Sequence, residues 1–187
     1  MNKALSNFDI YRLLNNKTRI VTYNELQAFP TIESLLSPFG NAVILYPGTD
    51  GDIGHWTCVF YGISDSGAPI ISFFDPYGIS VDNEFKMLQD NETPRYLARL
   101  LYHTHYPIEY NHNKLQKFSK NINTCGKHVV NRIWNQDLPL SIYNKIFGGK
   151  NADKIVTKII GYIYIFIYSF FLFSNINLTC MLWLAGT

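Results

Sequence analysis

Residues 121–130 read NINTCGKHVV, a turn that leads directly into a helix with Cys125 in its first turn. Asn and Thr cap helix N-termini, and after Cys125 apolar residues recur at helical spacing (Val129, Val130, Ile133 and Trp134). A thiol placed there lies at the positive end of the helix dipole, beside backbone N–H groups without intrahelical partners, and both favour the thiolate. Gly126 has no side chain and leaves room for another backbone to approach. The stretch therefore predicts a cysteine nucleophile at a helix start.

The composition is that of one folded domain in a reducing compartment. The 187 residues, 47% of them apolar, suffice to bury a core. The 16 basic and 14 acidic residues give a net charge of +2, which makes no electrostatic case for a nucleic-acid surface. The three cysteines (Cys58, Cys125 and Cys180) are too few, and odd in number, for a disulfide framework. We also expect no signal peptide, because the N-terminus lacks a long apolar run and a small-residue cleavage site.

The order of predicted elements indicates an α+β domain. Short apolar runs bounded by turn residues predict strands at 42–46, 55–61, 69–74 and 108–111, with an extended piece at 18–23. Apolar residues at helical spacing and capping residues such as Ser6 predict helices at 7–14, 34–36, 83–90, 95–103, 125–134 and 141–147. We expect a central mixed β-sheet flanked by helices, in which strands 55–61 and 69–74 form a hairpin.

That hairpin would bring a histidine and a carboxylate to one end of the sheet. His55 opens its strand directly after the glycine-rich loop 48–54, and Asp75 follows the strand that pairs with it. Asp75 could then fix the tautomer of the His55 ring and support its protonated form, which completes a nucleophile, base and orienting group with Cys125. Gln116, in the loop before the cysteine helix, offers an amide donor to a developing oxyanion, and the N–H of Cys125 offers a second.

Each of these residues also has a plain structural explanation. A histidine on a strand is more often structural, Asp75 before Pro-Tyr-Gly is typical of a turn, a helix-start cysteine is more often simply packed, and Gln116 alone suggests a solvated loop. Cys58 lies three residues after His55, so its side chain points to the opposite face and is expected in the core. Cys180 is assigned no chemistry. The spacing of His103, His105, His112 and His128 is not that of a zinc site, so we expect no metal.

These motifs resemble those of the adenovirus-protease and ubiquitin-like-protein protease group. The resemblance rests on Gly54-His55-Trp56, on FFDPYG at 73–78 and on Gln116 ahead of Thr124-Cys125-Gly126, and it spans about residues 5–147. More narrowly, the motifs are similar to those of the versions found in large DNA viruses, virophages and Maverick/Polinton elements. The resemblance implies a papain-like, circularly permuted cysteine protease fold. It also implies His55 as general base, Asp75 as its orienting residue, Cys125 as nucleophile and Gln116 in the oxyanion hole.

The resemblance further implies peptide hydrolysis near glycine in precursor proteins, for instance virion or capsid precursors during maturation. Trp56 would line the channel over the scissile bond, and Gly126 would lie beside the substrate. The spacing from Gln116 to Cys125 is longer than in better-known relatives, so Asn121 or Asn123 are alternative amide donors. We expect a monomer that needs no metal or organic cofactor, in the virion or in the host cytoplasm or nucleus. Two other functions stay open: removal of ubiquitin-like modifiers by the same chemistry, and a catalytically silent protein-binding module.

The C-terminal end is the least typical part of the chain. All 30 charged residues lie at or before Lys158, and the uncharged window 159–178 has the length of a membrane-spanning helix. Lysines ahead of it would favour a cytoplasmic protease body. The alternatives are a segment packed on the domain and a poorly folded extension. We therefore expect a cysteine protease domain at 1–150 and an apolar C-terminal extension at 151–187, with a candidate membrane anchor.

Overall fold

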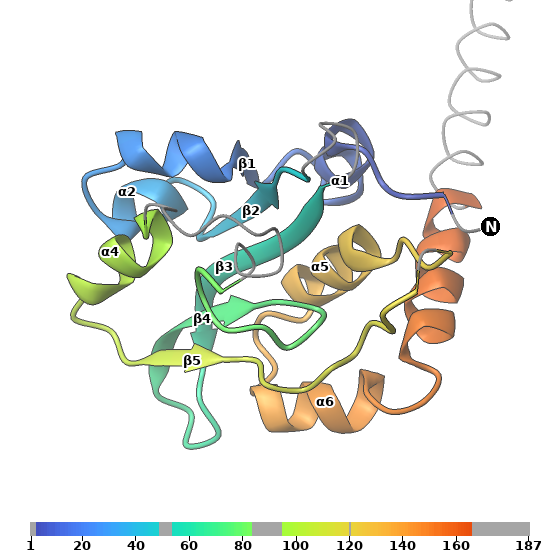
Figure 1. Ribbon diagram of the computed structural model, residues 1–187. Coiled ribbons are helices and arrows are strands. Elements are labelled where there is room, and N and C mark those ends of the chain that lie inside the picture. Colours follow the sequence, from blue (N-terminus) through green and yellow to red (C-terminus); the bar gives the residue numbers. More distant parts are fainter. Residues whose placement is uncertain (1–2, 49–53, 84–94, 120, 166–187) are drawn as a thin grey trace, which may run out of the picture.

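A computed structural model describes residues 3–48, 54–83, 95–119 and 121–165, which form an α+β structure on a five-stranded mixed sheet (Figure 1). The strands stand in the sheet in chain order: β1 (Arg19–Thr22), β2 (Asn41–Tyr46), β3 (His55–Ile63), β4 (Pro69–Phe74) and β5 (Ile108–Tyr110). The two outer pairs, β1–β2 and β4–β5, are parallel, and the two inner pairs are antiparallel. The predicted central mixed sheet and its hairpin are confirmed.

The register of the hairpin decides where the polar residues at its open end lie. Phe74, the last residue of β4, pairs with Cys58 of β3, and β3 extends beyond that pair to His55. Asp75 therefore leaves the sheet beside the first residues of β3, as the sequence predicted. Cys58 itself is fully buried, which confirms its expected core position.

The helices agree closely with the predicted ones. They are α1 (Asn7–Leu13), α2 (Ile32–Leu36), α4 (Tyr96–Tyr102), α5 (Cys125–Trp134) and α6 (Leu140–Phe147). The α1 helix begins with the predicted cap, because Ser6 Oγ accepts a hydrogen bond from the N–H of Asp9 at 3.2 Å, and Leu5 and Ile10 are both buried beside it. A 3-10 helix, η1 (Tyr23–Ala28), was not predicted. The predicted helix 83–90 lies outside the described residues but for its first residue.

Both faces of the sheet are covered (Figure 1). On one face η1, α2 and α4 pack on the sheet through a cluster that includes Tyr23, Leu35, Ile44, Phe73 and Leu100. On the other face α1, α5 and α6 pack through a second cluster that includes Ile10, Phe60, Phe74, Val129 and Tyr143. Neighbouring residues of β2 and β3 alternate between the two clusters, as the two-residue period of a strand requires.

A further helical segment covers residues 152–165 and belongs to the second cluster. Ala152, Val156 and Ile160 lie four residues apart on its buried face, and the hydroxyl of Tyr164 donates to Asp9 Oδ1 of the first helical turn at 2.9 Å. The expected division of the chain at residue 150 therefore does not mark the edge of the packed core. Within the described ranges, no helix has both the length and the apolar character for crossing a membrane, and most of window 159–178 lies outside those ranges.

Candidate active site

Asp75 contacts the His55 ring at the open end of the β3–β4 hairpin. His55 Nε2 lies 2.9 Å from Asp75 Oδ2, and the Asp75 side chain is fully buried. The other carboxylate oxygen accepts from the N–H of Tyr77 at 2.5 Å, and the Asp75 carbonyl accepts from the side-chain amide of Asn111 at 2.9 Å. Asp75 is thus both the turn residue of the plain interpretation and the histidine partner of the functional one.

Cys125 approaches the same imidazole from the other side of the site. It is the first residue of α5, only 7% of it is exposed, and its thiol is a hydrogen-bond partner of the His55 ring. Because Asp75 engages Nε2, the nitrogen left for the sulfur is Nδ1. The three residues that the sequence predicted as nucleophile, base and orienting group therefore meet at one ring.

The charge on His55 follows from these neighbours. Burial of the ring lowers its pKa, but the hydrogen bonds with Asp75 and Cys125, together with their negative charges, outweigh burial and raise the pKa of His55 to about 10. The imidazolium is therefore the stable form of His55 at neutral pH. A thiolate beside an imidazolium is the reactive form of a cysteine nucleophile.

Tyr77 forms a wall of the site that the sequence analysis did not assign. Its ring stacks on the His55 ring with 4.7 Å between centroids, and on the Phe118 ring with 4.1 Å between centroids. Burial and the negative charges of Cys125, Asp75 and Asp153 raise the pKa of Tyr77 to about 12, so its hydroxyl stays protonated at neutral pH. Its place after Asp-Pro in the FFDPYG motif was the available signal.

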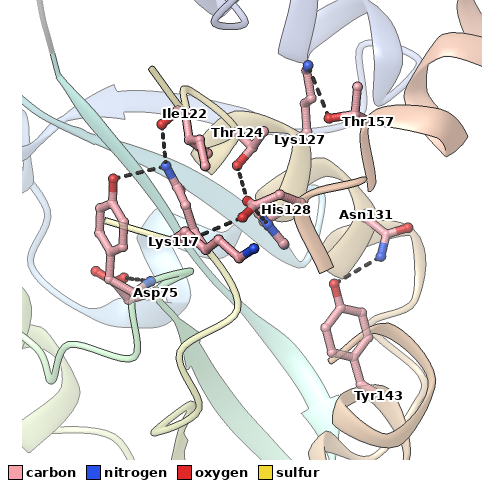
Figure 2. Close-up of polar contacts among 12 residues, drawn as sticks. Asp75, Lys117, Ile122, Thr124, Lys127, His128, Asn131, Tyr143 and Thr157 are labelled. Atoms are coloured by element: carbon pink, nitrogen blue, oxygen red, sulfur yellow. Dashed lines mark hydrogen bonds and ion pairs between the residues drawn. The ribbon is translucent and has the colours of Figure 1, made fainter. Parts of the chain in front are cut away.

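Gln116 reaches the site through Tyr77. Its side chain is buried, and its Nε2 donates to the Tyr77 hydroxyl at 2.9 Å and to the Ile122 carbonyl at 3.1 Å (Figure 2). Both amide protons are therefore engaged, and one must be released before Gln116 donates to an oxyanion. The side chains of Asn121 and Asn123, the alternative donors, are exposed. The oxyanion role of Gln116 stays a prediction.

The two residues predicted to touch substrate face the protein's own core. The indole of Trp56 is 7% exposed and donates from Nε1 to the Leu5 carbonyl at 3.1 Å. A Cβ atom placed on Gly126 would lie 3.1 Å from Leu5 Cβ and 3.3 Å from both Ile10 Cδ1 and Trp56 Cδ1. The missing side chain of Gly126 thus admits the N-terminal segment of the same chain. Contact of either residue with substrate stays a prediction.

The start of α5 differs from the sequence expectation in one respect. Thr124 occupies the N-cap position, but its hydroxyl makes no capping hydrogen bond and donates instead to Asp153 Oδ1 at 2.5 Å (Figure 2). Thr124 therefore does not cap the first turn of α5, because its hydroxyl donates to the carboxylate of Asp153 on another helical segment. His128 also binds Asp153, through Nε2 at 3.1 Å.

In the described ranges, no group of three or more His, Cys, Asp or Glu side chains could hold a metal ion. Cys180 lies outside them.

Comparison with known proteins places the chain in a viral family. No family model matches it. It is similar to the uncharacterized protein V9 of Sputnik virophage, with 36% identity over 168 residues, 83% of this chain and 93% of V9. Identity of this degree over nearly the whole of both chains shows common descent, so the chain belongs to the family of the Sputnik virophage protein V9.

Proposed function

We propose that this protein is a cysteine endopeptidase of the papain-like, circularly permuted kind, which cleaves precursor proteins through Cys125, His55 and Asp75. One observation carries the proposal: a single imidazole has a buried carboxylate 2.9 Å from one nitrogen and the thiol of a helix-start cysteine as its other partner. A merely packed cysteine and a merely structural histidine would not require the third, fully buried group.

The reaction would begin from the ion pair. The Cys125 thiolate attacks the peptide carbonyl carbon, and the carbonyl oxygen takes the negative charge of the tetrahedral intermediate. The His55 imidazolium gives its proton to the departing amine, which leaves a thioester on Cys125. Neutral His55 then removes a proton from water, the hydroxide attacks the thioester, and the acid product leaves as the thiol is restored. Asp75 keeps the ring oriented throughout.

Stabilisation of the oxyanion would come from the start of α5. The N–H of Cys125 lies in the first turn, where backbone N–H groups point out of the helix and the helix dipole favours negative charge. Gln116 is the candidate second donor, since the Tyr77 hydroxyl that holds it belongs to the ring stacked on His55. Removing one such donor typically lowers turnover by ~10²–10³.

The substrate class follows from the resemblance and is supported by the viral relative. The resemblance implies virion or capsid precursors, cut near glycine, as the substrates, and a relative from a virophage is consistent with viral precursors. The protein would then act in the virion or in the host cytoplasm or nucleus, where a reducing environment keeps Cys125 as a free thiol. Any membrane attachment would come from the residues after 158.

The test compares Cys125→Ala with Cys58→Ala, which removes the other described thiol of the same core cluster. Purified full chains are incubated with virion precursors and, separately, with ubiquitin-like modifiers extended beyond their terminal glycine. We expect the wild type and Cys58→Ala to cut the precursors and Cys125→Ala to cut nothing, with an unchanged circular dichroism spectrum. Cleavage of the modifiers alone would establish the deconjugating alternative. Cleavage by Cys125→Ala would end the proposal.

A second measurement covers a negative result with these substrates. Iodoacetamide reacts with thiolates, so mass spectrometry of the alkylated peptides reports the reactivity of each cysteine. We expect Cys125 to react far faster than Cys58 at pH 7, because burial strongly raises the pKa of the Cys58 thiol. Equal and slow reaction of both would show a silent site.

A further inference from the structure

The Asp153 carboxylate has three hydrogen-bond partners around the candidate active site. Its Oδ1 accepts from Thr124 Oγ1 at 2.5 Å and lies 3.1 Å from His128 Nε2, while its Oδ2 accepts from the backbone N–H of Lys117 at 3.1 Å. Dashed lines in Figure 2 mark these contacts at the labelled residues Thr124, His128 and Lys117. None of these contacts involves the three residues of the proposed chemistry.

The partners are nevertheless the immediate neighbours of that chemistry. Thr124 precedes the nucleophile Cys125, and Lys117 follows Gln116 in the chain. A single carboxylate therefore holds both ends of the connection between the candidate oxyanion donor and the nucleophile.

The carboxylate is well suited to hold both ends. Burial raises the pKa of Asp153, but hydrogen bonds from His128, Thr124 and Lys117 more than offset it and leave that pKa below its ordinary value. The group is thus ionised at neutral pH, and hydrogen bonds to an ionised acceptor are shorter and stronger than those between neutral groups.

The element that carries Asp153 is itself fixed. On the same helical segment, Ala152 and Ile160 belong to the core cluster that contains α5, and Val156 is fully buried. The ammonium group of Lys127 on α5 donates to the Thr157 hydroxyl at 3.4 Å (Figure 2). The carboxylate therefore stands on a packed helix and not on a loop, which is the requirement for holding a site within a fraction of an ångström.

We propose that Asp153 is a positioning residue of the active site: through Thr124 and the N–H of Lys117 it sets the distance between Cys125 and Gln116. The inference rests on the proposed function, since it concerns the same site. It makes the helical segment that begins at residue 152 part of the catalytic machinery.

The first test replaces Asp153 by Asn, which keeps the size but removes the charge and turns one acceptor into a donor facing Thr124 or Lys117. A displacement of the reacting groups by about 1 Å lowers the rate on the order of 10²-fold. We expect a drop of about 10- to 100-fold in kcat with KM nearly unchanged, and a comparable drop in the rate of Cys125 alkylation by iodoacetamide at pH 7. Asp137→Asn makes the same chemical change at an exposed position beyond the far end of α5 and should have no effect.

A second pair of variants separates positioning from general stability. Thr124→Ser keeps the hydroxyl that Asp153 binds, and Thr124→Val replaces it by a methyl group of similar size. We expect Thr124→Ser to retain activity and Thr124→Val to lose it, and the double variant Thr124→Val/Asp153→Asn to be no slower than the worse single one. Melting temperatures of all variants are measured beside the rates.

The outcomes separate this inference from the proposed function. If wild-type Cys125 cuts precursors or reacts faster than Cys58, and Asp153→Asn behaves like Asp137→Asn, the inference is overturned and the protease stands. Rates that fall only in proportion to the folded fraction, or equal activity of Thr124→Ser and Thr124→Val, would also overturn it. If wild-type Cys125 shows neither cleavage nor enhanced alkylation, the proposed function fails, and this inference with it.

Discussion

At the scale of single residues, His55 is the group on which the site depends. Its ring receives a buried carboxylate at one nitrogen and a thiol at the other, and its pKa rises from 6.5 to about 10. The folded chain therefore binds a proton here that the unfolded chain releases between pH 6.5 and 10. The contribution of this proton to the free energy of unfolding is complete below pH 6.5 and declines as the pH rises through 10.

A titration of His55 by NMR tests this charge state directly. We expect the ring carbon protons of His55 to titrate with a midpoint near pH 10 in the wild type. Asp75→Asn should lower that midpoint, because it removes the negative charge of the carboxylate that raises the pKa of His55, while burial, which lowers this pKa, stays. A midpoint near 6.5 in the wild type would contradict the ion pair on which the proposed mechanism depends.

The residues of the site differ in how far the sequence could predict them. His55, Asp75 and Cys125 follow from local patterns, namely the two ends of a hairpin and the start of a helix, which short-range signals define well. Asp153 could not be found in this way, because its hydrogen bond to Thr124 joins positions 29 apart in the chain. It also lies after residue 150, outside the residues that the sequence assigned to the protease domain.

At the scale of elements, α5 is fixed by close contacts near each of its two ends. Gly126 lets α1 and Trp56 approach closely, and Arg132 near the other end stacks between the rings of Phe60 and Tyr143, each 4.7 Å from its guanidinium carbon. The helix that carries the nucleophile is therefore fixed at both ends, which suits a residue whose sulfur must meet a fixed ring.

The packing at Gly126 gives a prediction about stability. Gly126→Val adds atoms where a Cβ alone already lies within 3.3 Å of three side chains, and overpacking of this kind costs about 1–3 kcal/mol. Gly161→Val is the matched control, because a Cβ there would meet nothing within 4 Å, and Val forms helices slightly better than Gly. Urea unfolding should show a lower midpoint for Gly126→Val and an unchanged or slightly higher one for Gly161→Val. Equal midpoints would mean that the close contact at Gly126 does not exist in solution.

The elements themselves were predicted where their pattern was clear. The continuous apolar runs of β2 to β4 fit strands that are buried on both faces, and the apolar stripes of α1 and α5 have the 3.6-residue period of helices buried on one face. The 3-10 helix η1 was not predicted. Its signal was the spacing of Thr22 and Glu25, whose carboxylate accepts from both the N–H and the hydroxyl of Thr22.

At the scale of the whole molecule, the described residues after 150 pack against the second cluster, the one that contains α5. Their apolar composition suggested a tail, whereas Ala152 and Ile160 lie in the same cluster as Val129 of α5, and Val156 between them is fully buried. The three readings that the sequence left open concerned the uncharged residues from 159 onward, which have no charged face to indicate a direction of packing. For residues 152–165 the structure supports the packed one.

Val156→Ala tests whether this segment is part of one cooperative fold. Val156 is fully buried, and removing about two methylene equivalents at ~0.8 kcal/mol each, with some penalty for the cavity, should lower the free energy of unfolding by roughly 2 kcal/mol. Lys154→Ala, at an exposed position of the same segment, is the control and should change it little. Unfolding in urea is followed by circular dichroism and by tryptophan fluorescence, with all variants in a Trp183→Phe background so that the fluorescence reports only Trp56 and Trp134. If the segment closes the core, both signals of Val156→Ala move together to lower urea, because the helix and the sheet unfold as one unit. If the segment is an appendage, the fluorescence transition stays in place while only part of the helical signal is lost earlier.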